Sequence, residues 1–197
     1  MTSRALAGLR VVDLTRALGA LCGKILADLG ADVLRIEPPG GHPLRRRAPL
    51  ADGVAAEEAG LGWWAYAAGC DSAVLDLDRE DDRARLLDLA RRADVLLESF
   101  SPGYLSRLGL GWEPLHRANP ALVLTSITPF GQTGPHAGFR GPELVLQAMG
   151  GMIHHVGDPD RPPVRVGGDQ AALQAGGQAA IGTLMACAER DLSLIHI

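Results

Sequence analysis

Arginine supplies nearly all the positive charge of this sequence, and three arginines are consecutive. Arg45, Arg46 and Arg47 come a few residues after a Gly-Gly pair, and Lys24 is the single lysine of the chain. A guanidinium group binds phosphate or carboxylate oxygens through two parallel N–H donors. The cluster therefore has two interpretations: a solvated group of charges on a long surface loop, or an electropositive rim for an anionic ligand.

A second candidate binding element is the turn Thr-Arg-Ala-Leu-Gly at residues 15–19. It matches neither the G-x-G-x-x-G dinucleotide loop nor the G-x-x-x-x-G-K-[ST] phosphate loop. Its position between a strand and a helix is informative, because ligands of open parallel sheets bind beyond the carboxyl ends of the strands, near helix N-termini. The turn is either part of a nucleotide site or a purely structural connection.

The elements that must position these residues follow a repeated strand–helix pattern. Leu9–Leu14 is a strand, 17–29 is an amphipathic helix ended by Gly30, and 31–37 is the next strand. The same rhythm predicts strands near 9–14, 32–37, 73–77, 94–98 and 122–127, and helices over 17–29, 82–93, 104–108, 113–118, 143–152 and 171–188. This is typical of an α/β fold with a doubly wound parallel sheet and helices on both faces.

Two further loops are expected at the same edge of the sheet as the 15–19 turn. Residues 99–103 and 128–135 are rich in Ser, Gly and Pro, and each follows a strand. This edge is the candidate site. The aromatic cluster at residues 63–66 is expected to pack in the core rather than bind a ligand.

Bulk properties exclude several classes of protein. The 197 residues suffice for one domain or slightly more, and the net charge of −4 argues against a nucleic-acid surface. The three cysteines are widely spaced, and no long apolar run could form a signal core or a membrane span. These features predict a soluble, cytoplasmic protein without a membrane partner.

The histidines do not suggest a metal site. His154 and His155 are adjacent and would point apart on a helix or a strand, so no shared metal is expected. His42, His116 and His136 are isolated and are expected to be ordinary loop histidines.

Six segments, in order, resemble the class III CoA-transferases of the carnitine, bile-acid and formyl-CoA type. They are LADLGADVLRIEPPGG, SAVLDLDRED, ADVLLESFSPGYLSRLGLGW, NPALVLTSITPFGQTGP, PPVRVGG and AIGTLMA. The resemblance as a whole covers the chain from Leu6 to about Ala188. The resemblance implies a Rossmann-like CoA-binding domain over residues 1–190, forming the N-terminal half of a longer protein. Residues 191–197 are expected to be a truncated or non-native tail.

The resemblance also implies where coenzyme A binds. It assigns Arg16 and Ala17 in the first turn, Phe100, Gly103 and Arg107 in SFSPGYLSR, and Arg140 before GPELVLQ. Arg107 and Arg140 would meet phosphates, and Phe100 would lie against the adenine. The family's basic pair before SAVLDL is Cys70-Asp71 here, so weaker CoA binding is expected.

The resemblance further implies an aspartate nucleophile that attacks the acyl-CoA thioester. The family position falls on Ala172, which cannot perform this reaction. Asp169, three residues earlier, is either a displaced nucleophile or the N-cap of the last helix. Racemisation, as in related enzymes, is not expected, because Pro142 and Ala172 occupy the approximate places of the required His–Asp pair.

Two functions follow from the resemblance. The first is a CoA-transferase that moves CoA between an acyl-CoA and a small carboxylic acid, with no metal. The alternative is a degenerate, non-catalytic half or subunit that supports an active partner. The family also implies an interlocked homodimer or heterodimer for the full-length form.

Overall fold

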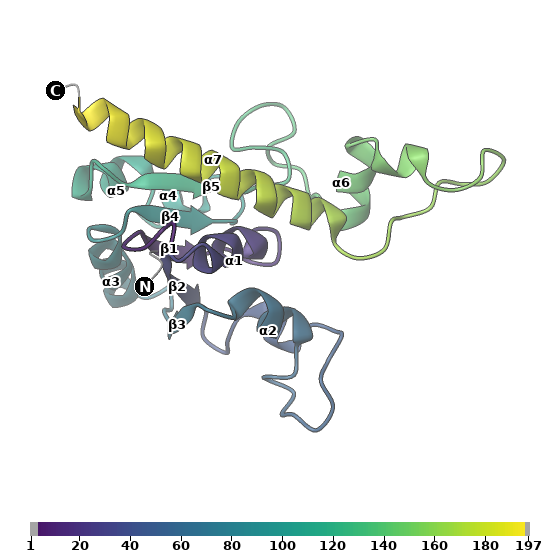
Figure 1. Cartoon of the computed structure of the whole chain (residues 1–197), viewed down its shortest axis with the longest axis horizontal. Coiled ribbons are helices and arrows are strands. Elements are labelled where there is room, and N and C mark those ends of the chain that lie inside the picture. The colour runs from purple at the N-terminus through teal and green to yellow at the C-terminus, as the bar shows by residue number, and fades with distance from the viewer. Residues whose placement is uncertain (1–3, 196–197) are drawn as a thin grey trace.

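The computed structural model describes residues 4–195, which form an α/β fold as the sequence predicts (Figure 1). In chain order the elements are β1 Arg10–Leu14, α1 Ala20–Asp28, β2 Asp32–Glu37, the 3₁₀ helix η1 Pro43–Arg46, α2 Leu61–Ala67, β3 Asp71–Val74, α3 Glu80–Ala90, β4 Val95–Glu98, α4 Tyr104–Arg107, α5 Trp112–Ala118, β5 Val123–Ser126, α6 Glu143–Met149, the 3₁₀ helix η2 Met152–His155 and α7 Gln170–Ile195.

The five strands form one sheet in the order β3-β2-β1-β4-β5, and every neighbouring pair is parallel. From β1 the chain moves outward to β2 and β3, and later from β4 outward to β5. The order therefore reverses between β1 and β4. In open parallel sheets the crevice at such a switch point, beyond the carboxyl ends of the strands, is the usual place for a ligand.

Helices cover both faces of the sheet (Figure 1). On one face α3, α4 and α5 bury leucines such as Leu86, Leu105 and Leu115 against Val12 and Leu96. On the other face α1 and α7 pack together over the alternate strand residues, where Leu26 and Ala180 belong to the same cluster as Val95. The central strands β1 and β4 are buried on both faces, which explains their mostly apolar sequences, whereas the edge strand β3 is largely exposed.

A buried ion pair anchors the first helices to the sheet. The Arg35 guanidinium on β2 lies 3.4 Å from the Asp13 carboxylate on β1, and both side chains are almost fully buried. The same guanidinium donates to the carbonyl oxygens of Ala20 at 2.7 Å and Tyr66 at 2.8 Å. It therefore fixes the start of α1 and the end of α2 to the sheet.

Several elements differ from the sequence prediction. Helix α1 begins at Ala20 rather than at residue 17, α3 covers Glu80–Ala90 rather than 82–93, and α6 ends at Met149 rather than at residue 152. The third strand was predicted at 73–77, but β3 ends at Val74, and the buried Leu75 and Leu77 lie in the segment that follows. The aromatic residues 63–66 form part of helix α2, with Trp63 buried as expected but Trp64 exposed. The last helix runs through residues 191–195 of the predicted tail, whereas residues 196–197 lie outside the described part of the chain.

Across residues 4–195, no helix has both the length and the apolar character that crossing a membrane requires.

Candidate functional site

A pocket of about 160 Å³ opens at the carboxyl edge of the sheet, where the sequence places the site. We call it the edge pocket. Its walls come from the ends of β1 and β2, from the segment after β3 and from the loop and helix after β4: Leu14, Thr15, Arg16, Ile36, Glu37, Pro38, Pro39, His42, Pro43, Leu75, Asp76, Leu77, Asp78, Phe100 and Tyr104. The lining combines an apolar slot with the exposed guanidinium of Arg16 and with three carboxylates, those of Glu37, Asp76 and Asp78.

Two of the predicted CoA-binding residues meet at the switch point between β1 and β4. The Arg16 amide donates to Ser99 Oγ at 2.7 Å, which joins the first turn to the loop after β4. The Arg16 guanidinium carbon lies 5.5 Å from the centre of the Phe100 ring, and that ring lies 4.6 Å from the Tyr104 ring. Neighbouring aromatic rings, here tilted by 32°, beside a cation suit a flat heteroaromatic group that carries phosphate.

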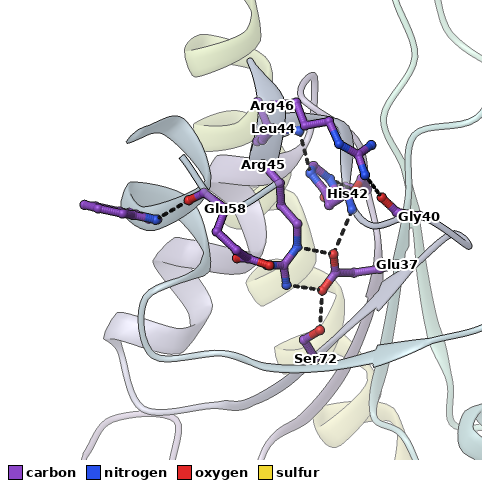
Figure 2. A network of polar contacts seen from close by, with 10 residues as sticks. Glu37, Gly40, His42, Leu44, Arg45, Arg46, Glu58 and Ser72 are labelled. Carbon is purple, nitrogen blue, oxygen red and sulfur yellow. Dashed lines mark hydrogen bonds and ion pairs between the residues drawn. The ribbon is translucent and has the colours of Figure 1, made fainter. Parts of the chain in front are cut away.

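The Glu37 carboxylate organises the wall of the edge pocket formed by residues 38–45 (Figure 2). It accepts hydrogen bonds from the His42 amide at 2.7 Å, from Arg45 Nε at 2.6 Å and Nη2 at 2.7 Å, and from the Ser72 hydroxyl. Burial by itself would raise the pKa of Glu37, but these donors outweigh it and lower the pKa to about 2. The carboxylate is therefore charged throughout the physiological range.

The three consecutive arginines separate into different roles. Arg45 lies 4.1 Å over the Trp63 ring and pairs with Glu37 and Glu58, so it is neither a solvated charge nor an open rim for a ligand. Arg46 is exposed and donates to the carbonyl oxygen of Gly40. Arg47 pairs with Asp169 at 2.7 Å.

The other predicted CoA-binding residues lie outside the edge pocket. Gly103 lines a second pocket, described below, and its φ of +75° allows the turn into α4. Arg107 is exposed on α4, with its guanidinium 5.9 Å from the Tyr104 ring. Ala17 lines a narrow cavity of about 10 Å³ at the start of α1. Arg140 is exposed in the loop before α6.

That narrow cavity also contains Asp169 and Ala172, the two positions considered for the nucleophile. The Asp169 carbonyl oxygen accepts from the Leu173 amide at 2.9 Å, which is the bond of an N-cap residue. Its carboxylate, however, does not cap the helix. It faces Arg47 and, at 3.6 Å, Arg165.

The carboxylate that caps α7 belongs to Glu143 at the start of α6. It accepts from the amides of Ala171 at 2.6 Å and Ala172 at 3.3 Å. Burial would raise the pKa of Glu143, but hydrogen bonds from Gln147 and from these two amides bring a net decrease. An anion at a helix N-terminus is favoured by the free N–H groups and the helix dipole.

A second pocket, the β4–β5 pocket, lies beside the switch point and has a volume of about 170 Å³. The buried Glu98 carboxylate at its base accepts from the Phe100 amide at 2.7 Å and from Gln132 at 3.1 Å. Burial raises the pKa of Glu98, and hydrogen bonds from Ser126 and the Phe100 amide offset part of the effect. Glu98 thereby links the loops after β4 and β5, as expected for loops at one edge.

Several of these contacts had no clear sequence signal. His42 was expected to be an ordinary loop histidine, but it is buried, lines the edge pocket and lies 5.2 Å from the Trp63 ring. Glu37 could have been suspected, because it is a charged residue at the carboxyl end of a predicted strand. Glu143 carried no signal, since its partners are distant in sequence. Among residues 4–195, no group of three His, Cys, Asp or Glu side chains could hold a metal ion.

Comparisons with known proteins agree with this architecture. Residues 6–193 match the sequence model of CoA-transferase family III. The succinyl-CoA:(R)-benzylsuccinate CoA-transferase subunit BbsE of Thauera aromatica is 42% identical over 177 residues, covering 90% of this chain and 43% of that protein. The acetyl-CoA:oxalate CoA-transferase of Acetobacter aceti is 42% identical over 172 residues, covering 86% of this chain and 43% of that protein.

A solved structure agrees equally well. The crystal structure of a CAIB/BAIF family protein from Brucella suis superimposes with a TM-score of 0.91 at 36% identity, covering 98% of this chain and 51% of that one. The α/β fold is thus shared with that protein. This chain belongs to CoA-transferase family III. It spans less than half the length of the curated relatives that it matches.

Proposed function

We propose that this chain is the CoA-binding half of an enzyme that transfers CoA between an acyl-CoA thioester and a carboxylic acid. The observation that carries the proposal is the edge pocket at the switch point, with Arg16 over Phe100. The two relatives described above are named as transferases between an acyl-CoA and a carboxylic acid, which supports the same reaction class.

In this proposal the edge pocket takes the nucleotide end of CoA. The adenine would lie against Phe100 in the slot that Leu75 and Leu77 complete, and Arg16 would neutralise phosphate oxygens. Ala17, Gly103, Arg107 and Arg140 stay predicted contacts, and Arg107 lies beside the lining residue Tyr104. Those four residues would contact parts of CoA that extend beyond the pocket.

The test is calorimetric titration of the chain with CoA. Arg16→Ala and Phe100→Ala should each weaken binding about tenfold or more, since each removes a charge-assisted or stacking contact. Arg117→Ala, which removes an exposed arginine from α5, is the matched control and should bind as the wild type does. Equal affinity in all four proteins would place the CoA site elsewhere.

Covalent transfer needs a nucleophile that this half does not supply at the family position. In the family reaction a carboxylate oxygen attacks the thioester carbonyl, the C–S bond breaks, and CoA leaves as a thiolate, giving an acyl–enzyme anhydride. Ala172 has no such oxygen. Asp169 is three residues away from that position, which is a displacement of roughly 4.5 Å along a helix. Its carboxylate is also held by an ion pair with Arg47.

A second candidate function is therefore a supporting subunit without catalysis of its own. The observation in its favour is the alanine at position 172 beside an ion-paired Asp169, and the relative BbsE is itself named as a subunit. Incubation with an acyl-CoA, followed by hydroxylamine and mass spectrometry, separates the two candidates. A hydroxamate on Asp169, absent in Asp169→Asn, would establish catalysis by this chain. No adduct is expected.

We also propose that the chain works in the cytoplasm as part of an interlocked homodimer or heterodimer of longer subunits. Its three cysteines form no disulfide, as suits a reducing compartment. Ile181, Met185 and Leu192 are more than half exposed along one side of α7. Such an apolar stripe is typical of a surface that another chain or domain covers.

A further inference from the structure

His42 joins the two walls of the edge pocket. It follows the Pro38–Gly41 turn and begins η1, and only 2% of its surface is exposed. Its Nε2 lies 3.0 Å from the carbonyl oxygen of Thr15, in the turn that carries Arg16. Its Nδ1 accepts a hydrogen bond from the Leu44 amide at 3.2 Å. One ring therefore connects the turn after β1 to the loop after β2.

These two contacts determine the protonation state of the ring. The Leu44 amide can only donate, so Nδ1 must be the unprotonated nitrogen. The Thr15 carbonyl oxygen can only accept, so Nε2 must carry the proton. The neutral Nε2–H form satisfies both partners. A second proton, on Nδ1, would point at the Leu44 N–H and break that hydrogen bond.

The surroundings of His42 favour the neutral form. Burial lowers its pKa below the usual 6.5, and the hydrogen bond to Thr15 offsets only part of this decrease. Trp63 from α2 contributes an uncharged ring. The charged groups around it are Asp13 of β1, Arg35 and Glu37 of β2, and Arg45 of η1 over the shared Trp63 ring, with Arg16, Asp76 and Asp78 elsewhere on the pocket wall.

We propose that His42 is a positioning residue for CoA. Its neutral ring joins the Thr15–Arg16 turn to η1, and its protonation on Nδ1 breaks the Leu44 hydrogen bond and so uncouples these two segments. The inference rests on the proposed function, because it assigns the edge pocket to the nucleotide. His42 itself need not touch the ligand. It acts through Thr15, which precedes Arg16, and through Leu44, which follows the lining residue Pro43 in η1.

The test compares two substitutions with opposite chemistry. His42→Gln keeps an N–H donor for Thr15 but does not titrate, whereas His42→Phe keeps a ring beside Trp63 but cannot donate. The matched control is His116→Gln, because His116 stacks on Trp112 at 4.8 Å on α5. The ligand is dephospho-CoA, since the 3′-phosphate of CoA has a second pKa of about 6 and would titrate in the same range.

At about pH 7.5 the Phe variant should bind dephospho-CoA about three- to tenfold more weakly than the wild type, the range for one lost hydrogen bond. The Gln variant should bind within about twofold of the wild type. On acidification the wild type and His116→Gln should lose affinity, while His42→Gln should not. Wild-type affinity in His42→Phe, or an unchanged pH profile in His42→Gln, would overturn the inference.

Nitrogen NMR of the His42 imidazole in the wild-type protein tests the inference without a variant. Free protein should show the Nε2–H tautomer, and saturation with dephospho-CoA should lower the pKa of His42, because binding and deprotonation must favour each other reciprocally. A His42 pKa that binding leaves unchanged would overturn the inference alone. If the wild type binds neither CoA nor dephospho-CoA at any pH, the proposed function is refuted, and the inference with it.

Discussion

Replacing Glu37 by glutamine should destabilise the fold more than the same replacement of Glu58, the other carboxylate in the network of Figure 2. The Glu37 side chain is 2% exposed, and its two oxygens accept bonds from the His42 amide, Arg45 and Ser72. In Glu37→Gln one oxygen becomes an NH₂ group that faces donors. The Arg45 guanidinium then loses its buried anion and keeps only the exposed Glu58.

The magnitude follows from the pKa of the carboxylate. A pKa lowered from 4.5 to about 2 corresponds to about 3 kcal/mol of stabilisation of the charged form at neutral pH, at about 1.4 kcal/mol for each tenfold change in proton affinity. Measured losses on breaking a buried ion pair are of similar size, about 3–5 kcal/mol. We therefore expect Glu37→Gln to lower the free energy of unfolding by about 3 kcal/mol.

The assay is urea denaturation followed by circular dichroism at neutral pH. The matched control is Glu58→Gln, which removes the other carboxylate that pairs with Arg45 but whose side chain is 54% exposed. Exposed pairs contribute about 0–1 kcal/mol, so the control should be nearly neutral. A loss below about 1 kcal/mol in Glu37→Gln, or equal losses in both variants, would refute the reasoning.

The pH dependence provides an independent check on the same residue. Because folding lowers the pKa of Glu37, the unfolded chain binds more protons between its ordinary pKa of 4.5 and the folded value of about 2. The stabilisation is therefore complete above pH 4.5 and is lost as the pH falls through this window. The difference in stability between the wild type and Glu37→Gln should shrink over the same interval.

Two further predictions concern packing and association. A Cβ on Gly23 would lie 2.1 Å from Asp13 Oδ2, so Gly23→Ala should lower the free energy of unfolding by about 2 kcal/mol in urea denaturation. A Cβ on Gly177 of α7 meets nothing within 4 Å, so Gly177→Ala should be neutral or stabilising by up to about 1 kcal/mol. Equal effects of the two substitutions would contradict this. The chain should self-associate through the exposed apolar stripe of α7. Light scattering should therefore show a smaller molecular mass for the double variant Ile181→Glu/Met185→Glu than for the loop control Val54→Glu. A monomeric wild type would refute this prediction.

Sequence periodicity predicted the fold well because the helices and strands are buried on regular faces. The strands near 9–14, 32–37, 94–98 and 122–127 are confirmed as β1, β2, β4 and β5 within about one residue. The strand predicted at 73–77 was less accurate. Leu75 and Leu77 are apolar and buried, but they continue past the last pairing of β3 with β2, at Val74. Burial without strand pairing gives the same sequence pattern as a strand.

The site was predicted only where it depends on the ends of strands. The common edge brought together Arg16 and Phe100, which lie in loops that follow parallel neighbours. The environments of His42 and Glu143 depend on contacts with Thr15 and with the start of α7, and no local pattern encodes them. The same is true of the contact between Arg47 and Asp169, which are 122 residues apart in the sequence.

The central claim is that the edge pocket receives the nucleotide of CoA, and a crystal structure of the chain with CoA bound tests it most directly. We predict the adenine against Phe100 in the edge pocket, with a phosphate oxygen within hydrogen-bond distance of Arg16. An adenine in the β4–β5 pocket beside Glu98 and Trp112, or a ligand remote from Arg16 and Phe100, would contradict the account.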